Sequence, residues 1–163
     1  FTRFIAVDPS IGGTTSLDWS AAGSFNQRAM AALWQMKALG WPINGSRDSW
    51  RFAIMYVLGT NDNAQGTTQA AFTARGNSFI SSVRGIGCTA DIFVATSTML
   101  NGVVNTALQA AQAALIDNNN GIYTLGSMDS LTGANRQFDD THLSLTGEDN
   151  WAAICSTTFQ NHY

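Results

Sequence analysis

A carboxylate and an imidazole stand three residues apart near the end of the sequence, in the stretch Phe-Asp-Asp-Thr-His-Leu-Ser at 138–144. On a loop that leads into a helix, Asp139 can reach back to one ring nitrogen of His142. It would fix the tautomer of the imidazole and leave the other nitrogen free to take a proton from a nucleophile. By itself the spacing favours a structural pair, with Asp139 as a helix cap and His142 on the surface. A second polar group elsewhere in the chain strengthens the catalytic interpretation.

That second group is the side-chain amide of Asn61, which follows a nearly continuous apolar run ending at Leu58. If the run is a strand, Asn61 lies at its carboxyl end, where open α/β sheets bind their ligands. Its N–H could donate to a developing oxyanion, and Gly12 or Gly13 could offer a backbone N–H with no side chain in the way. The structural alternatives are a helix cap at Asn61-Asp62 and a simple positive-φ turn at the glycines.

Three segments together resemble the SGNH (GDSL-type) hydrolases. Gly-Thr-Asn-Asp at 59–62 resembles their Gly-x-Asn-Asp block, and Asp139 with His142 resembles their final Asp-x-x-His block. Ile-Gly-Gly-Thr at 11–14 with Trp19 is similar to a segment of the acetylesterases of that superfamily, the sialate and acetylxylan esterase type. The matches run in family order from about residue 4 to the end. No Gly-Asp-Ser or Gly-Gln-Ser nucleophile block is present.

The resemblance implies a serine esterase that removes acetyl or other short acyl groups from a carbohydrate through an acyl-enzyme, without a metal or organic cofactor. His142 would be the base and Asp139 its orienting partner, while Asp140 would point elsewhere. Asn61 and either Gly13 or Gly12 would be the oxyanion donors. The alternative, prompted by the absent nucleophile block, is a non-catalytic carbohydrate-binding or structural module with a decayed hydrolase site.

Residues 8–14 allow two placements of the nucleophile. In one, Asp-Pro-Ser at 8–10 is an altered Gly-Asp-Ser block and Ser10 attacks the substrate. In the other, which we favour, residues 9–14 match the second block of the acetylesterases, because that match explains the two glycines, Thr14 and Trp19 together. The first strand and its serine would then precede Phe1, on a removed, cleaved or separate segment. We expect a retained fragment, an exchanged strand or a partner chain to fill the open sheet edge beside residues 3–7.

The order of predicted elements gives the fold class. Strands are predicted at 3–7, 50–58, 91–96 and 122–125, and helices at 25–39, 67–83, 103–116 and 145–159. The strand at 50–58 is expected to be buried on both faces, and residues 127–141 form a long polar loop. This alternation predicts an α/β domain with a doubly wound, mostly parallel sheet and helices on both faces. The resemblance adds a three-layer, flavodoxin-like SGNH fold, with residues 1–163 as the C-terminal portion of a domain lacking its first strand.

Composition narrows the range of partners and locations. The chain has 163 residues, one lysine and a net charge of −3, so nucleic acid is not an expected partner. No apolar run is long enough to span a bilayer, so a membrane is not expected either. The Thr- and Asn-rich surface favours an extracellular, cell-surface or phage-associated setting. Cys88 and Cys155 can be one disulfide or two free thiols.

Two further residues carry expectations that a structure can test. Trp19 lies in the segment of the oxyanion glycine, so it is the tryptophan to consider as a sugar contact, although burial in the core is the simpler role. His162 is one residue from the end of the sequence and is expected to lie in a frayed tail.

Overall fold

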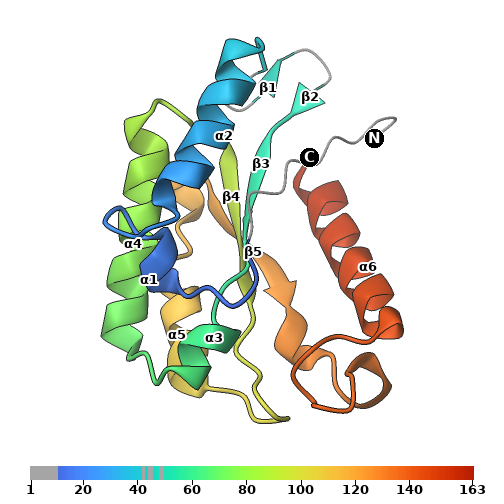
Figure 1. The fold of residues 1–163 in the computed structure, drawn as a ribbon. Helices are drawn as coiled ribbons and strands as arrows, with labels where there is room; N and C mark the ends of the chain where they lie inside the picture. Colours follow the sequence, from blue (N-terminus) through green and yellow to red (C-terminus); the bar gives the residue numbers. More distant parts are fainter. Residues whose placement is uncertain (1–10, 42, 44–45, 48–49) are drawn as a thin grey trace.

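The computed structural model describes residues 11–41, 43, 46–47 and 50–163. Its centre is a sheet of three parallel strands, β3 (Ala53–Tyr56), β4 (Asp91–Thr96) and β5 (Ile122–Ser127), in the order β3-β4-β5 (Figure 1). The register pairs Met55 with Phe93 and Phe93 with Tyr123. A short antiparallel pair, β1 (Ser46–Arg47) and β2 (Trp50–Arg51), precedes the sheet. The predicted strand at 3–7 lies outside the described residues.

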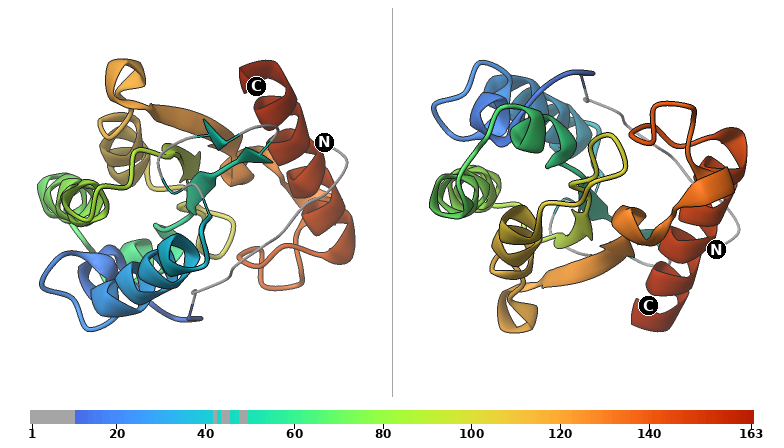
Figure 2. Two further views of the ribbon diagram at one scale, coloured as in Figure 1. Left: turned by 90° about the horizontal axis from the view of Figure 1, so that it is seen from above. Right: turned by 90° about the horizontal axis from the view of Figure 1, so that it is seen from below.

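Helices cover both faces of the sheet. α2 (Asn26–Ala38), α4 (Gln69–Gly85) and α5 (Thr106–Ala113) lie on one face, and α6 (Leu145–His162) lies on the other (Figure 2). The remaining helices are short: α1 (Ser16–Trp19), α3 (Thr60–Ala64), η1 (Asn118–Asn120), η2 (Met128–Ser130) and η3 (Gly133–Asn135). The predicted α/β fold with a parallel sheet and helices on both faces is confirmed. Within the described residues, no helix has the length and apolar character needed to cross a membrane.

Each face of the sheet has its own apolar core, because successive strand side chains point to opposite faces. Ile92 and Val94 pack with Phe72 and Leu108 under α4 and α5. Phe93 and Leu125 pack against α6. Each fully buried side chain of this size contributes about 2 kcal/mol to folding, so these two cores hold the layers together.

The two cysteines lie in different cores. Cys88 belongs to the cluster under α2, α4 and α5, and Cys155 belongs to the cluster under α6. Both are buried free thiols. Of the two alternatives that the sequence leaves open, the structure therefore has the free thiols.

The predicted strand at 50–58 and the predicted helix at 103–116 differ most from the observed elements. The predicted strand at 50–58 is divided at Phe52, and its expected burial on both faces is wrong at Met55, which is 44% exposed. Among the described strands, β3 pairs only with β4, so it lies at an edge. The helix predicted from 103 begins at Thr106, because the Asn105 side chain accepts the N–H groups of the first turn at 3.1 Å.

His162 is not in a frayed tail. It ends α6, and its Nε2 lies 3.1 Å from Oδ2 of Asp91 at the start of β4. The Tyr163 hydroxyl donates to the same carboxylate oxygen at 2.9 Å. The imidazole also packs against the rings of Phe93 and Tyr123. These contacts, made with residues far away in the sequence, fix the end of α6 to the sheet.

Candidate active site

The polar segments of interest gather where the parallel strands end, at the lower edge of the sheet in Figure 1. The segment with Asn61 follows β3, the loop 97–105 follows β4, and the loop 128–144 with Asp139 and His142 follows β5. Two hydrogen bonds join the first two segments. Asn63 Nδ2 donates to the Thr98 carbonyl at 2.8 Å, and Asn105 Nδ2 donates to Asn63 Oδ1 at 2.9 Å.

Asp139 and His142 are brought together as the sequence predicts. Oδ2 of Asp139 lies 2.6 Å from Nδ1 of His142, and Oδ1 accepts the N–H groups of Thr141 at 2.9 Å and His142 at 3.0 Å. The His142 side-chain bond, followed by the two backbone bonds, lowers the pKa of Asp139 to about 2. The carboxylate is therefore ionised at neutral pH and favours the proton on Nδ1, which leaves Nε2 as the basic nitrogen. The His142 side chain is 71% exposed, so a ligand can approach it.

A buried arginine shapes the turn that carries this pair. Arg136 is only 9% exposed. Its guanidinium donates to the carbonyls of Leu131 and Thr141, each at 2.6 Å, and also to the carbonyl of Met128. The Gln137 N–H closes the turn by donating to the His142 carbonyl at 2.9 Å. Sequence reasoning missed this role, although Arg136 is the only arginine or lysine after residue 84.

The turn that holds Asp139 and His142, called the dyad turn below, also contacts the loop after β4. The Asn101 N–H donates to Thr141 Oγ1 at 2.8 Å, and the Gly102 N–H donates to the Asp140 carbonyl at 3.1 Å. Asp140 has a φ of 51°, so the chain reverses there. This arrangement gives Asp140 a place at the contact between the two loops, while Asp139 alone faces the imidazole.

A buried carboxylate holds the loop after β4 in place. Asp129 accepts the Thr98 and Met99 N–H groups, at 2.8 and 2.9 Å, on Oδ1. Its Oδ2 accepts the Thr98 hydroxyl at 2.6 Å and the Gln109 amide at 2.9 Å. Burial of this carboxylate is therefore compensated by several donors. Asp129 is the second supporting residue that the sequence did not reveal.

The amide of Asn61 lies next to the glycine segment. Asn61 Nδ2 donates one hydrogen to the Thr14 carbonyl at 3.2 Å, and an amide group carries a second hydrogen. Gly13 has a φ of +77°, which suits glycine, and a Cβ placed on Gly12 or Gly13 would meet nothing within 4 Å. Both glycines are exposed.

Trp19 holds the glycine segment at 11–14 from the side of the core. Its Nε1–H donates to Thr14 Oγ1 at 2.8 Å, and Thr14 Oγ1 donates to the Ile11 carbonyl at 2.8 Å. The indole is only 7% exposed. The idea that Trp19 offers its face to a sugar is therefore wrong, because its ring is in the core and its N–H is used.

The neighbouring Asp62 connects α3 to α1. It is fully buried, and it accepts the Ser16 N–H at 2.8 Å and the Ser16 hydroxyl at 2.6 Å. Arg75 lies 3.6 Å away from the same carboxylate. Gly59, just before α3, has a φ of +146°, and a Cβ there would lie 2.1 Å from the Ser97 carbonyl oxygen. These constraints fix the position of α3, and therefore of Asn61, relative to the end of β3.

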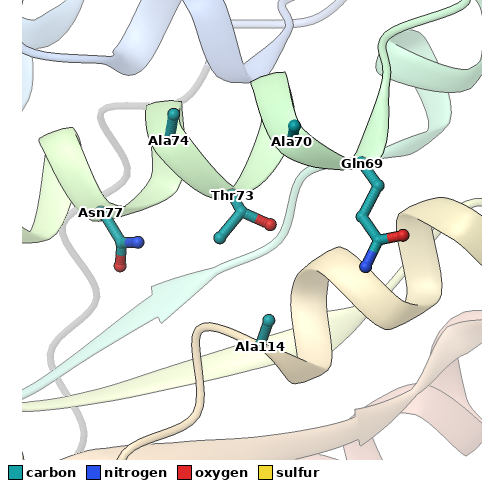
Figure 3. A pocket seen from close by; sticks show the side chains of 6 residues that line it. All are labelled: Gln69, Ala70, Thr73, Ala74, Asn77 and Ala114. Atoms are coloured by element: carbon teal, nitrogen blue, oxygen red, sulfur yellow. The ribbon is translucent and has the colours of Figure 1, made fainter.

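The nucleophile is the remaining part of the predicted site. Ser10 lies outside the described residues. In the part of the chain that the structure describes, no serine side chain forms a hydrogen bond with His142. A shallow hollow lies elsewhere, between α4 and the end of α5, and Figure 3 shows it lined by Gln69, Ala70, Thr73, Ala74, Asn77 and Ala114. None of the predicted site residues lines it.

Neither a protein-family model nor a curated protein sequence matches the chain. Among solved structures, the chain is similar to the crystal structure of a carbohydrate esterase family 3 protein from Talaromyces cellulolyticus, with a TM-score of 0.59. The two are 13% identical, and the match covers 91% of this chain and 68% of that chain. At this identity the likeness shows a shared fold.

Proposed function

We propose that this chain provides the base, its orienting carboxylate and the oxyanion donors of a serine esterase that removes acetyl or other short acyl groups from a carbohydrate. The observation that carries the proposal is the 2.6 Å contact between Asp139 Oδ2 and His142 Nδ1. It leaves a basic nitrogen exposed at the carboxyl edge of a parallel sheet, where such folds bind ligands. The SGNH resemblance and the fold shared with a carbohydrate esterase support the choice of reaction and substrate.

Each residue has a defined part in the reaction. A serine hydroxyl attacks the acyl carbon while His142 Nε2 takes its proton. The tetrahedral oxyanion accepts hydrogen bonds from the Gly13 N–H, with Gly12 as the alternative donor, and from the second N–H of Asn61. His142 then protonates the departing sugar alcohol. Water, activated by the same imidazole, hydrolyses the acyl-enzyme, and Asp139 stabilises the imidazolium in both halves of the reaction.

We propose that the serine comes from a strand preceding Phe1, on the same chain or on a separate one, with Ser10 as the alternative. Two observations support this choice. Asn61 and Trp19 both bind Thr14, as expected if residues 11–14 form the oxyanion segment. In addition, β3 pairs only with β4 among the described strands, which is consistent with a further strand at its second edge. The Thr- and Asn-rich composition is consistent with an extracellular, cell-surface or phage-associated protein.

A non-catalytic carbohydrate-binding module is the second candidate. The observation that favours it is that no serine of the described residues bonds to His142. In such a protein Asp139 and His142 would be a surface pair with no proton to transfer. The two candidates differ in one measurable property, which is covalent reactivity.

Two measurements on the full-length protein test the proposal: an assay with p-nitrophenyl acetate and labelling with a fluorophosphonate. The chain has two histidines, so His162→Gln is the matched control for His142→Ala. We expect His142→Ala to lose about 10³-fold or more in kcat, while His162→Gln stays close to the parent. Mass spectrometry of the labelled protein identifies the serine. Equal turnover by the parent and His142→Ala, or absence of labelling, would support the non-catalytic module.

A further inference from the structure

Exposed apolar side chains border the Asp139–His142 pair. Phe138 immediately precedes Asp139 and is 100% exposed. Val103 is 68% exposed and follows Gly102, whose N–H binds the Asp140 carbonyl. Leu145 begins α6, just after the dyad turn, and is 82% exposed. Single exposed apolar residues are common on proteins, but here two lie on the two loops that meet beside His142 and a third begins the helix that follows.

The two loops at 97–105 and 128–144, together with the first turn of α6, form what we call the rim of the site. The charge of this rim is negative. Asp139 and Asp140 lie on the turn itself, and Glu148 is in the first turn of α6. Arg136 is the only arginine or lysine between residues 97 and 163, and its buried guanidinium is used by three backbone carbonyls. The other cations of the described residues belong to β1, β2, α2 and α4. No cation of the loops at 97–105 and 128–144 is therefore available to bind an anionic ligand.

We propose that this rim selects an uncharged acylated sugar, with Phe138 as the platform for one face of the sugar ring and Asp140 as a charge that disfavours anionic sugars. The inference rests on the proposed esterase function and specifies its substrate class. It divides the acetylated sugars into neutral ones, which the rim accepts, and sugars bearing a carboxylate, which it disfavours.

The physical reasons concern hydration and charge. A sugar ring has one face of C–H groups, which can cover an aromatic ring and remove apolar surface from water. Phe138 has all of its surface available for this contact. A carboxylate on the sugar would stand in the field of Asp139 and Asp140. A unit charge about 6 Å away in water changes binding roughly 3-fold, and salt screens this effect.

The experiment compares two substrates that differ by one charge: an O-acetylated uronic acid and its uronamide. The ring is the same in both, and only the first carries a carboxylate. We expect kcat/KM of the full-length protein to be about 3-fold to 10-fold higher for the uronamide at low salt. The ratio should approach one near 1 M NaCl, where the Debye length is about 3 Å. Equal values at low salt, or faster hydrolysis of the uronic acid, would overturn the charge selection.

Asp140→Asn is the matched variant for the charge. Asparagine tolerates the φ of 51° at this position, and the backbone carbonyl that binds Gly102 is kept. The uronamide preference should fall by about 3-fold in this variant, with uronamide hydrolysis unchanged. An unchanged preference would show that Asp140 is not the discriminating charge.

Phe138→Ala tests the platform, with Phe138→Trp as the variant that keeps an aromatic ring. For the uronamide we expect Phe138→Ala to raise KM about 5-fold or more, and Phe138→Trp to restore the parent value. Glycerol triacetate has no ring, so its hydrolysis should be the same in all three proteins. If the parent does not hydrolyse glycerol triacetate, the proposed function itself fails. If the parent hydrolyses glycerol triacetate, and Phe138→Ala affects both substrates equally or neither of them, then Phe138 does not contact the sugar ring.

Discussion

The Asn101 N–H donates a 2.8 Å hydrogen bond to Thr141 Oγ1, and this bond ties the loop after β4 to the turn that holds Asp139 and His142. Thr141 lies between the two members of the pair, and its own N–H binds Asp139 at 2.9 Å. The position of the imidazole relative to the sheet edge therefore depends on a hydroxyl that touches neither ring nitrogen.

Thr141→Val should lower kcat by about fivefold, because a bond worth roughly 1 kcal/mol is lost where it orients the base. Thr141→Ser keeps the hydroxyl and should retain the parent kcat. Steady-state kinetics and the rate of fluorophosphonate labelling measure the effect. A fall in melting temperature without a fall in the labelling rate would show that Thr141 acts on stability alone.

Acid should weaken the dyad turn in a defined range. The pKa of Asp139 is lowered from 3.8 to about 2 by its bonds from His142 and Thr141. The folded chain therefore binds fewer protons there than the unfolded chain, and the stabilisation present above pH 4 is lost as the pH falls toward 2. Urea midpoints between pH 5 and pH 2 should fall more steeply for the parent than for Asp139→Asn. Parallel curves would contradict the assignment.

Asn61→Ala removes an amide N–H that we assign to the oxyanion, so kcat should fall about 10²-fold to 10³-fold with little change in KM. Asn63→Ala is the control, since it removes an amide from the same short helix. The Asn63 amide binds the Thr98 carbonyl, so its loss should lower mainly the free energy of unfolding. Equal losses of kcat in the two variants would show that Asn61 acts only through the fold.

Asp62→Ala should lower the free energy of unfolding by about 3 kcal/mol or more, because the buried N–H and hydroxyl of Ser16 then lose their acceptor. Ser16→Ala loses one hydrogen bond and should cost about 1 kcal/mol. Chemical denaturation measures both. Comparable losses would mean that the Ser16 hydroxyl accounts for most of the carboxylate's contribution and that the Ser16 N–H and Arg75 add little.

Gly59→Ala should be far more destabilising than Gly66→Ala, although both glycines have positive φ values, of 146° and 65°. A Cβ at Gly59 would lie 2.1 Å from the Ser97 carbonyl oxygen, whereas a Cβ at Gly66 would meet nothing within 4 Å. The expected costs are more than about 3 kcal/mol and about 1 kcal/mol. Similar melting temperatures would show that the backbone at Ser97 can move.

Local patterns predicted the fold well. The strand at 91–96 was predicted with its observed bounds, because a short apolar run marks it. The helix at 25–39 was predicted within one residue at each end, because its apolar residues have helical spacing. The contact between Asp139 and His142 was also predictable, since it spans a single turn. The roles of Asn61 and Gly13 stay predictions until their chemistry is measured.

What the sequence did not reveal depends on distant partners. Thr98 and Asp129 are 31 residues apart, and Asp91 and His162 are 71 apart. No spacing rule connects such pairs, so the buried Asp129 was missed and His162 was wrongly placed in a tail. The sequence left two roles open for Trp19, because its burial depends on how α1 packs and not on its neighbours in the sequence.

The two free cysteines make each layer of the fold separately observable. Burial raises the pKa of Cys155 to about 11 and also raises the pKa of the Cys88 thiol, so neither forms a reactive thiolate while its layer is closed. A thiol reagent added under native conditions therefore times the opening of each side of the sheet. If α6 detaches first, Cys155 is modified while Cys88 stays protected; if the domain opens as one cooperative unit, both are modified at the same rate.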